Sequence, residues 1–353
     1  MAFTKINNTK INTIAAAVPK NIYQSKNYDW ITEEERKQFI DTTGIEQRRY
    51  ANLGVCTSDL AVDLCKYIFD TLKIDKSTID ALVFVSQSRD YVLPNTACII
   101  QDRLSLPKSC LAFDVPLGCS GYPYGISILS SIISASGGSI RKGLLIAGDV
   151  SSSDMNFRDK TTWPLFGDAV SVTIIEYDVN NSMPMYFDMQ TDGSGYSSLI
   201  IPDGAARNKY SHETLEEIEY APKVWRSGKN VVLEGLKIFE FTIHEVASNI
   251  LSLLKQANID KNIVDYYVLH QANKLMNETV RKQLKASPEQ VPYSLNAFGN
   301  TSSASIPLTI VASISEKVAN KNFVFSGFGV GLSWSSMFVK LNTETVILPL
   351  LEV

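Results

Sequence analysis

The sequence predicts an α/β protein made of two related halves, and three observations support this prediction. Short apolar runs rich in β-branched residues, such as ALVFV (81–85), alternate along the chain with segments in which apolar residues recur every three or four positions. Segments of the first half recur in the second half in the same order. The length of 353 residues leaves room for two domains, or for one large layered fold with a sizeable core.

The expected elements follow one another in a regular order. The first half offers a strand at 11–19, a helix at 57–72 and strands at 81–85, 143–148 and 170–175. A polar, irregular segment rich in Glu, Lys and Arg follows at 203–229, where we expect a surface excursion or a lid. The second half offers a helix at 240–257 and strands at 265–270, 323–327 and 335–341. This alternation predicts layers of helices on sheets whose central strands are largely parallel.

The internal repeat is clearest in two pairs of segments. IDKSTIDALVFVSQS (74–88) aligns without gaps with IDKNIVDYYVLHQAN (259–273), at an offset of 185 residues. KGLLIAGDV (142–150) aligns with the segment around Gly327, which lies opposite Gly148 at an offset of 179 residues. The two offsets are nearly equal and close to half the chain, which indicates that each half is one copy of a common unit.

The same alignment places Cys119 opposite Asn300. No Gly/Ser linker separates the halves, so we expect an N-terminal half at 1–180 and a C-terminal half at 181–353 that pack as one body. The cysteine belongs to the first of these halves and the asparagine to the second.

The composition excludes several classes of protein. The 33 basic and 37 acidic residues are mixed along the chain and give a net charge of −4, so we expect no extended basic surface for nucleic acid. No apolar run is long enough to cross a membrane, and we predict a cytoplasmic protein. The five cysteines form no CxxC pair and no histidine lies at zinc-ligand spacing, so we expect reduced thiols, no metal site and no cofactor.

The segment DVPLGCSGYPYG (114–125) contains the first candidate for catalysis. Cys119 lies between glycines, where a strand-like run ends and a helix-like run begins. A helix N-terminus lowers the pKa of a thiol and glycine lets a substrate approach closely, so Cys119 is a candidate nucleophile. The alternative is a small apolar residue that fills a turn, which is how we interpret the other four cysteines. The local pattern leaves both interpretations open.

Two further candidates lie in the second half. His270 comes where the apolar run YYVL ends, and ligands of α/β sheets bind at the carboxyl ends of strands. Asn300 in AFGNTSSAS opens a helix-like run, where a lone Asn would be interpreted as an N-cap. If the halves pack around a pseudo-twofold axis, Cys119, His270 and Asn300 come together at that axis. His212 and His244 are interpreted as structural or solvated.

Two other interpretations of these motifs fit the sequence less well. A Cys/His/Asn set also serves papain-like hydrolases, but the CGSCW-type context of that family is absent and an internal repeat has no place in it. The glycine-rich SGFGVGLSW (326–334) lacks the spacing of a dinucleotide-binding fingerprint, and a strand-like run follows it instead of a helix. Neither a hydrolase of that type nor a dinucleotide site is therefore expected.

Taken together, the motifs resemble those of the thiolase-fold condensing enzymes, and most closely β-ketoacyl-acyl-carrier-protein synthase III. The resemblance extends over nearly the whole chain. It is carried by TTGIEQRRY (42–50), LPNTACIIQDRL (93–104), AFDVPLGCSGYPYG (112–125), FGDA (166–169), HQAN (270–273), GNTSSASIP (299–307) and GFGVGLSW (327–334). It implies a thiolase-like fold, in which two βαβαβαββ halves related by a pseudo-twofold axis form α-β-α-β-α layers.

The resemblance also implies a role for each catalytic candidate. Cys119 would carry the acyl group as a thioester, formed by a thiol that the helix terminus activates. His270 and Asn300 would hydrogen-bond the thioester carbonyl of a malonyl donor while CO2 leaves. The backbone N–H groups of Cys119 and Val330 would form the oxyanion hole.

Three more positions are matched to substrate binding. Leu93 corresponds to a residue that reaches across the dimer interface into the partner's acyl pocket, so a homodimer is implied. Asn273 corresponds to a residue near the pantetheine arm of the substrate. Lys274 lies beside Leu275, which stands where the family has an arginine that helps to dock the carrier protein.

Other positions depart from the family pattern. Gln38 falls near the place of the tryptophan that stacks on the adenine of coenzyme A, and Thr42 replaces an arginine. The resemblance therefore leaves open whether acyl-CoA or acyl-carrier protein donates the primer. The nearby Arg158, Lys160 and Trp163 are candidates to replace the missing contacts.

Three functions follow as hypotheses. The first is decarboxylative Claisen condensation of an acyl-Cys119 thioester with malonyl-acyl-carrier protein, giving a β-ketoacyl product. The second is a non-decarboxylating acyltransferase of the same fold, which passes the acyl group to an alcohol or amine. The third is a non-catalytic subunit, which the complete set of Cys119, His270 and Asn300 disfavours. Acyl chain length and pathway are not encoded in the motifs.

Overall fold

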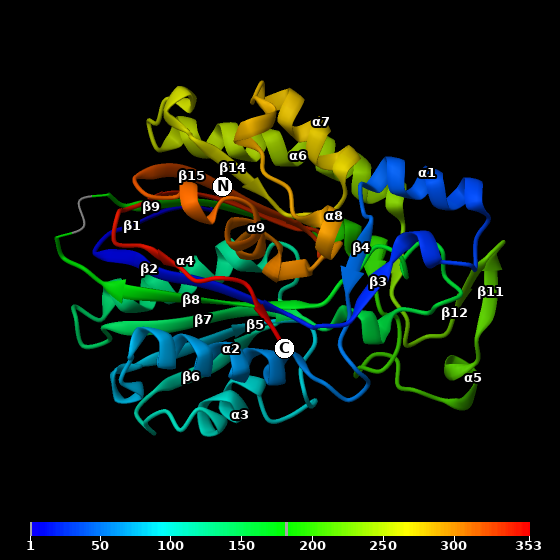
Figure 1. Cartoon of the computed structure of the whole chain (residues 1–353), viewed down its shortest axis with the longest axis horizontal. Helices are drawn as coiled ribbons and strands as arrows, with labels where there is room; N and C mark the ends of the chain where they lie inside the picture. Colours follow the sequence, from blue (N-terminus) through cyan, green and yellow to red (C-terminus); the bar gives the residue numbers. More distant parts are fainter. Residues whose placement is uncertain (1, 181–182) are drawn as a thin grey trace.

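Two β-sheets lie face to face with helices between them and on both outer faces, in the order α-β-α-β-α (Figure 1). This computed structural model describes residues 2–180 and 183–353. The seven-stranded sheet follows the order β17-β2-β8-β7-β5-β6, with β18 also pairing with β2, and the five-stranded sheet follows the order β1-β9-β16-β15-β14. The expected α-β-α-β-α layering is confirmed.

The strands of the larger sheet come from the first half and from the C-terminal end. They are β2 (Thr9–Val18), β5 (Ala81–Val85), β6 (Leu111–Val115), β7 (Lys142–Asp149), β8 (Ala169–Tyr177), β17 (Val346–Ile347) and β18 (Leu351–Glu352). Those of the smaller sheet are β1 (Ala2–Ile6), β9 (Met185–Thr191), β14 (Tyr266–Leu269), β15 (Lys321–Gly329) and β16 (Ser333–Leu341). Each chain end thus adds its strands to the sheet of the other half.

The sheets are mixed, so the prediction of largely parallel central strands is wrong. β5 pairs in parallel with β6 and β7, but β8 is antiparallel to both β2 and β7. Helices cover both faces of each sheet, so an antiparallel strand here is as continuously apolar as a parallel one. The apolar runs of the sequence therefore gave no information about strand direction.

The two halves share one sheet topology. The order β2-β8-β7-β5 in the larger sheet repeats as β9-β16-β15-β14 in the smaller one. In both, the first two pairings are antiparallel and the third is parallel. This match is what the sequence repeat leads one to expect. The boundary expected between residues 180 and 181 stays a prediction, since 181 and 182 lie outside the described residues.

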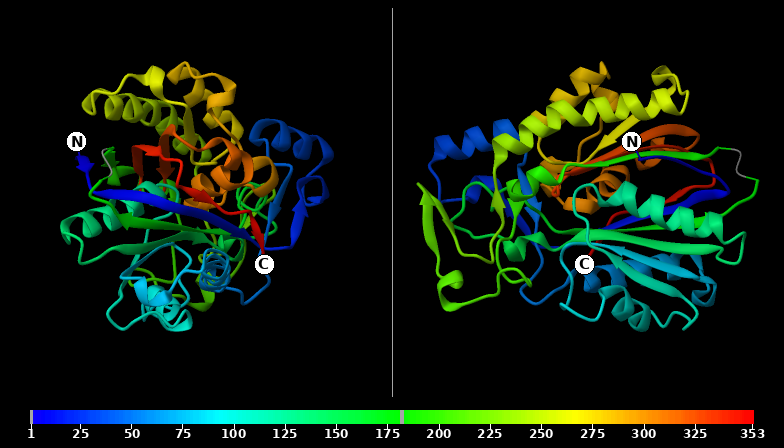
Figure 2. Two further views of the ribbon diagram at one scale, coloured as in Figure 1. Left: turned by 60° about the vertical axis from the view of Figure 1, so that its left-hand side comes forward. Right: turned by 180° about the vertical axis from the view of Figure 1, so that it is seen from behind.

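The helices form three layers (Figure 2). α2 (Thr57–Leu72) and α3 (Thr96–Arg103) cover the outer face of the larger sheet, and α6 (Gly235–Gln256) and α7 (Lys274–Leu284) cover that of the smaller sheet. α4 (Gly121–Ala135) and α9 (Ser305–Ser313) lie between the sheets. The helix expected at 57–72 has these bounds in the structure, whereas α6 begins five residues before the expected 240.

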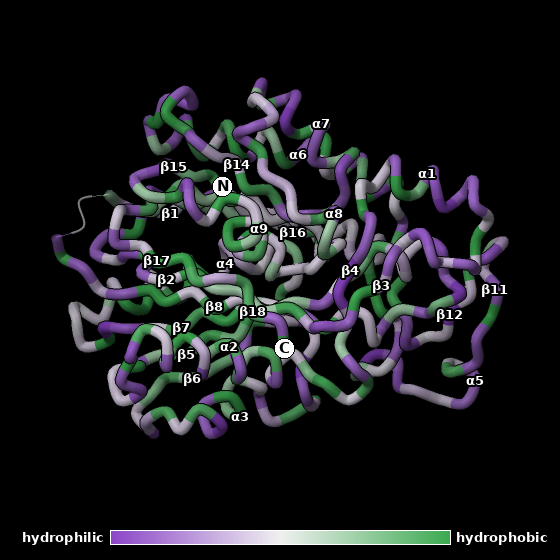
Figure 3. Tube along the Cα trace, viewed as in Figure 1, coloured by the Kyte–Doolittle hydropathy of each residue, from purple (hydrophilic) through white to green (hydrophobic). Residues whose placement is uncertain are grey.

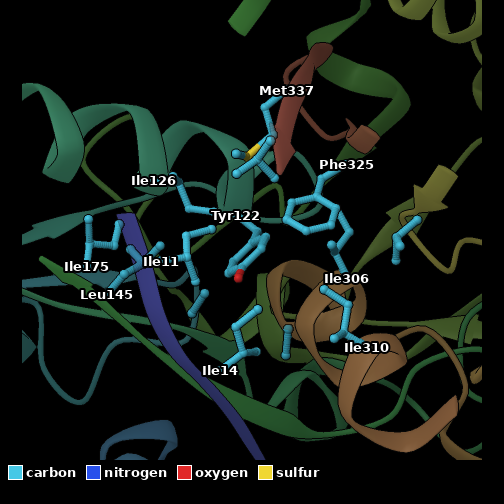
Figure 4. Packing of buried hydrophobic residues seen from close by; sticks show 14 of the residues in the cluster. Ile11, Ile14, Tyr122, Ile126, Leu145, Ile175, Ile306, Ile310, Phe325 and Met337 are labelled. Carbon is cyan, nitrogen blue, oxygen red and sulfur yellow. The ribbon is translucent and has the colours of Figure 1, made fainter. Parts of the chain in front are cut away.

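The central core packs α4 and α9 against both sheets (Figure 4). Tyr122 and Ile126 of α4 and Ile310 of α9 are fully buried there beside Phe325 of β15. The Tyr122 hydroxyl lies 2.9 Å from Thr173 Oγ1 of β8, so its polar atom is satisfied. Hydrophobic residues follow the strands and central helices, while hydrophilic ones gather on outer helices and loops (Figure 3). The central helices are thus held from both sides.

The segment 203–229 is more regular than expected. It contains the short helix α5 (His212–Leu215) and an antiparallel hairpin of β11 (Ile218–Ala221) and β12 (Val224–Arg226). It projects beside helix α1 (Glu33–Thr43) at one end of the molecule (Figure 1). At its base β10 (Leu199–Ile200) pairs with β13 (Val232–Leu233). Among the described residues, none of the helices is long and apolar enough to cross a membrane.

We predict that Ile126→Ala lowers the free energy of unfolding by about 2–5 kcal/mol, because it opens a cavity in a core that is closed from both sides. The matched change Leu251→Ala, on an exposed position of α6, should cost less than about 1 kcal/mol. Urea denaturation followed by circular dichroism measures both values. Equal losses in the two variants would contradict the assigned core.

Candidate active site

Cys119 lies at the centre of the molecule, two residues before α4 begins at Gly121. It is only 6% exposed. Strand β15 of the other half passes against it: a Cβ at Gly327 would lie 2.7 Å from the Cys119 carbonyl oxygen, and one at Gly329 would lie 3.0 Å from Sγ. Gly329 also has a φ of +155°, which side-chain-bearing residues rarely adopt. The glycines of GFGVG thus permit contact between the halves at the thiol.

Burial raises the pKa of the Cys119 thiol to about 12, and the nearby Asp149 carboxylate acts in the same direction. The backbone N–H groups of Val330 and Cys119 and the Ser302 hydroxyl act in the opposite direction. The prediction that the helix terminus gives a thiol of lowered pKa is therefore wrong for the free protein. The physical reason is that desolvation of a thiolate in this closed site outweighs the donors that face it.

His270 follows the last residue of β14 and is 1% exposed. Its backbone N–H donates to the Ser326 carbonyl at 2.8 Å, and its Nδ1 is hydrogen-bonded to Ser305 Oγ at 2.8 Å. Burial lowers the pKa of the imidazole to about 3, although a hydrogen bond with the Ser302 backbone raises it. The ring is therefore neutral near pH 7. In the tautomer in which Nδ1 accepts from Ser305, the other nitrogen carries a proton that it can donate.

Asn300 lies two residues before the short 3-10 turn Ser302–Ala304, which leads into α9. Its Oδ1 accepts from the Ser302 N–H at 3.0 Å, and its backbone is bonded to Leu165 and Gly167. Within residues 2–180 and 183–353, no hydrogen bond engages its Nδ2. The amide is thus held with its donor group available to a ligand.

The three candidates line one cavity of about 450 Å³. Cys119 and Asn300 occupy equivalent places, since each lies two residues before a helical segment that runs between the sheets. The structure therefore brings Cys119, His270 and Asn300 together, as the packing of the two halves around a pseudo-twofold axis predicts. Apolar side chains, among them Leu233, Ile238, Met276 and Phe328, form much of the remaining wall.

A second cavity of about 240 Å³ opens on another side of the same thiol. It shares Cys119, Phe166 and Leu199 with the first cavity. Its other lining residues are Gln87, Ser88, Asp149, Ser151, Asp154, Met155, Ile200, Ile201, Val231, Ser302 and Val330. Cys119 therefore stands at the junction of two separate spaces, one with the His and Asn and the other with two aspartates.

The remaining site residues from the sequence lie in different places. Asn273 lines the larger cavity and caps α7, where its Oδ1 accepts from the Met276 N–H at 2.9 Å. Leu93 is 79% exposed and does not line either cavity. Lys274 is exposed and lines a different hollow, which Asp41 also lines.

The three candidate replacements for coenzyme A contacts are mostly engaged elsewhere. Arg158 is paired with Glu217, and Trp163 stacks on the buried Arg48 at 4.4 Å. Only Lys160 lines the larger cavity, where Glu35 binds its amine at 3.1 Å. The structure thus offers no free aromatic side chain among these three to stack on an adenine.

Sequence reasoning missed several residues around the thiol. Asp149 ends the strand of GLLIAGDV, and Gln87 and Ser88 follow the strand ALVFV. Both segments are carboxyl ends of strands, which is the signal that singled out His270 and would have found them as well. Asp154 follows on the next turn, and no sequence pattern marks it.

Phe166 was also missed as a wall of both cavities, although its motif FGDA was noted. Its carbonyl accepts from Arg48 Nη1 at 3.2 Å, and its backbone forms a bridge with Asn300. Arg48 is 2% exposed and comes from β4 (Gln47–Arg49). A buried arginine thereby fixes the backbone next to the Asn300 amide. Among the described residues no group of His, Cys, Asp and Glu side chains could hold a metal ion.

Comparison with known proteins gives one consistent result. Residues 113–193 match the family described as 3-oxoacyl-[acyl-carrier-protein] synthase III, and residues 254–341 match its C-terminal part. A β-ketoacyl-[acyl-carrier-protein] synthase III of Clostridioides difficile is 31% identical over 337 residues, which cover 94% of this chain and 99% of that protein. One from Lactococcus lactis is 29% identical over 336 residues, with the same coverage. A 3-oxoacyl-(acyl-carrier protein) synthase structure from Burkholderia xenovorans superposes with a TM-score of 0.91 at 30% identity, covering 99% of both chains.

The raised pKa of Cys119 predicts how the free protein reacts with iodoacetamide. Because the thiolate fraction stays small at pH 8, the alkylation rate of Cys119 should rise throughout pH 8–10 and reach no plateau. Peptide mass spectrometry measures this rate, with the exposed Cys98 in the same sample as a check on the reagent. A plateau for Cys119 below pH 8 would show an activated thiolate and contradict this prediction.

Proposed function

The chain belongs to the 3-oxoacyl-[acyl-carrier-protein] synthase III family of condensing acyltransferases, and on this premise we propose that it performs a decarboxylative condensation. In this reaction an acyl group is first attached to Cys119. It is then joined to a malonyl group on acyl-carrier protein, with release of CO2 and a β-ketoacyl product. The observation that carries the proposal is that Cys119, His270 and Asn300 line one cavity.

The first step forms the acyl-enzyme. The Cys119 sulfur attacks the carbonyl carbon of an acyl thioester, the new C–S bond forms, and the donor leaves as a thiol that takes the Cys119 proton. Because burial holds this thiol protonated in the free protein, proton loss accompanies the attack and does not precede it. The N–H groups of Cys119 and Val330 both act on the sulfur, so they are placed to donate to the carbonyl oxygen once the acyl group is attached.

The second step generates the carbon nucleophile. Malonyl thioester enters the larger cavity, where Asn300 Nδ2 and the proton-bearing nitrogen of His270 donate to its thioester carbonyl. As the C–C bond to the carboxylate breaks, CO2 leaves and negative charge develops on that oxygen. A neutral imidazole suits this role because it donates a hydrogen bond without needing to release a proton.

The third step joins the two groups. The enolate carbon attacks the acyl-Cys119 carbonyl, a C–C bond forms and the C–S bond breaks. The β-ketoacyl product stays on the malonyl carrier, and the thiolate of Cys119 takes up a proton from solvent. In this proposal the smaller cavity holds the acyl chain. The larger cavity holds the malonyl group and its pantetheine arm, near Asn273.

The chain's departures from the family bear on the acyl donor and the partner. With Gln38 and Thr42 lining the hollow beside α1, and Trp163 packed on Arg48, we favour a carrier protein over coenzyme A as primer donor. Lys274 is exposed at the start of α7, and we propose that its positive charge helps to dock the carrier protein. Leu93 is proposed to enter the acyl cavity of a second copy, which makes the active enzyme a homodimer.

Single substitutions should affect acylation of Cys119 and decarboxylation of the malonyl group differently. Cys119→Ala should form no acyl adduct, whereas Asn300→Ala and His270→Ala should still acylate but release CO2 about 10²–10³-fold more slowly, because each removes one donor to the developing oxyanion. Intact mass follows the adduct, and CO2 release from labelled malonyl-carrier protein follows decarboxylation.

The matched control is Asn296→Ala, an exposed asparagine that lines neither cavity and should change neither rate. Full turnover by Cys119→Ala would overturn the assignment of the nucleophile. An Asn300→Ala variant that lost acylation and decarboxylation to the same degree would overturn the division of roles.

A further inference from the structure

The smaller cavity differs from a simple hydrocarbon pocket, because two carboxyl groups lie in its wall. Asp149 and Asp154 line it together with Cys119, and other lining residues, among them Met155 and Ile200, are apolar. An unsubstituted acyl chain would leave both carboxyl groups facing hydrocarbon, at a cost in free energy.

Asp149 is 1% exposed and uses only one of its oxygens. Its Oδ1 accepts from Ser86 Oγ at 2.9 Å, from the Gln87 N–H at 2.7 Å and from the Ser88 N–H at 3.0 Å. Its Oδ2 is buried and accepts no well-formed hydrogen bond from the described residues. Burial raises the pKa of this carboxyl group, while the Ser302 hydroxyl, which lines the same cavity, acts on it as a hydrogen-bond donor and lowers the pKa. A buried acceptor without a donor is uncommon and calls for a ligand or another explanation.

Asp154 is held by its backbone and leaves its side chain unused. Its carbonyl accepts from the Val231 N–H at 3.2 Å and from Asn230 Nδ2 at 3.3 Å. Within the described part of the chain, its carboxyl group makes neither a hydrogen bond nor an ion pair. Burial raises the pKa of this group to about 6, with contributions in the same direction from the charges of Asp149 and Asp168, while the charge of Lys229 acts in the opposite direction.

Other buried aspartates of this protein are satisfied. Asp168 accepts from Ala51 and Ser152, and Asp159 is paired with Arg226. Asp90 also has a buried oxygen without a hydrogen-bond partner, but it lines neither of the two cavities. Asp149 and Asp154 differ from it because they lie together on the wall of the cavity that also contains the thiol.

We propose that the smaller cavity selects a short acyl group that carries a hydrogen-bond donor, a hydroxyl or an amino group, which Asp149 and Asp154 bind. This inference rests on the proposed function, since it names the substrate class of the same site. The cavity volume of about 240 Å³ is below the roughly 300–1,000 Å³ of pockets for drug-sized ligands, which limits the chain to a short one. A carboxylate on the acyl group would be repelled.

The test compares three acyl-N-acetylcysteamine thioesters of equal chain length: 3-hydroxybutyryl, 3-aminobutyryl and butyryl. The rate of adduct formation on Cys119, followed by intact mass, should be at least about tenfold higher for one of the substituted groups than for butyryl. A higher rate for the amino compound identifies a cationic primer, and a higher rate for the hydroxy compound identifies a neutral one.

Variants assign the preference to the acids. Asp154→Leu should remove the preference and keep or raise the butyryl rate, while Asp154→Asn should reduce the rate for the amino compound more than that for the hydroxy compound. Asp70→Asn and Asp70→Leu, on an exposed position of α2, are the controls and should change nothing. If Asp154→Leu does not fold, the rates of the wild-type protein and of Asp154→Asn with the three thioesters still test whether the carboxyl groups bind the donor.

The failure of this inference differs from failure of the proposed function. Fastest acylation by butyryl in the wild type, or an unchanged preference in Asp154→Leu, would overturn the donor-binding role while leaving the condensing function in place. No adduct from any of the three thioesters would contradict acylation of Cys119, and with it both proposals.

Discussion

Strand β15 passes the backbone of Cys119 so closely that a side chain at Gly327 would lie 2.7 Å from the Cys119 carbonyl oxygen. This contact joins the two halves, because β15 belongs to one half and Cys119 to the other. It also places the Val330 N–H next to the sulfur and helps to bury the thiol. The cavities, the unusual pKa values and the fixed hydrogen bonds around the thiol all depend on this close approach.

Burial then decides the protonation state of Cys119 and of His270 in the free protein. It raises the pKa of Cys119 and lowers that of His270, so the free site holds a neutral thiol and a neutral imidazole and no ion pair. Stabilisation of charge must therefore come from fixed donors at the moment when charge develops on substrate oxygens. In the proposed reaction, Asn300, held by Ser302, and the backbone N–H groups of Cys119 and Val330 would be these donors.

Site residues could be predicted from the sequence where a reactive side chain lies in a segment that is repeated or that ends a strand. The repeat associated Cys119 with Asn300, and the end of the strand YYVL singled out His270, because equivalent positions in two related halves meet at their interface. Strand direction could not be predicted, since strands buried on both faces look alike whichever way they run. The thiol pKa was predicted with the wrong sign because local motif reasoning includes the helix terminus and omits desolvation, which depends on packing by distant segments.

In the proposed condensation, Cys119 carries the acyl group while His270 and Asn300 bind the malonyl thioester that reacts with it. The most direct test loads Cys119 with an acyl group, removes excess donor, adds malonyl-carrier protein labelled in its carboxylate, and counts labelled CO2 against β-ketoacyl product. The account predicts one CO2 for each product formed and for each acyl group lost from Cys119. Loss of the acyl group to an alcohol or amine without CO2 would contradict it.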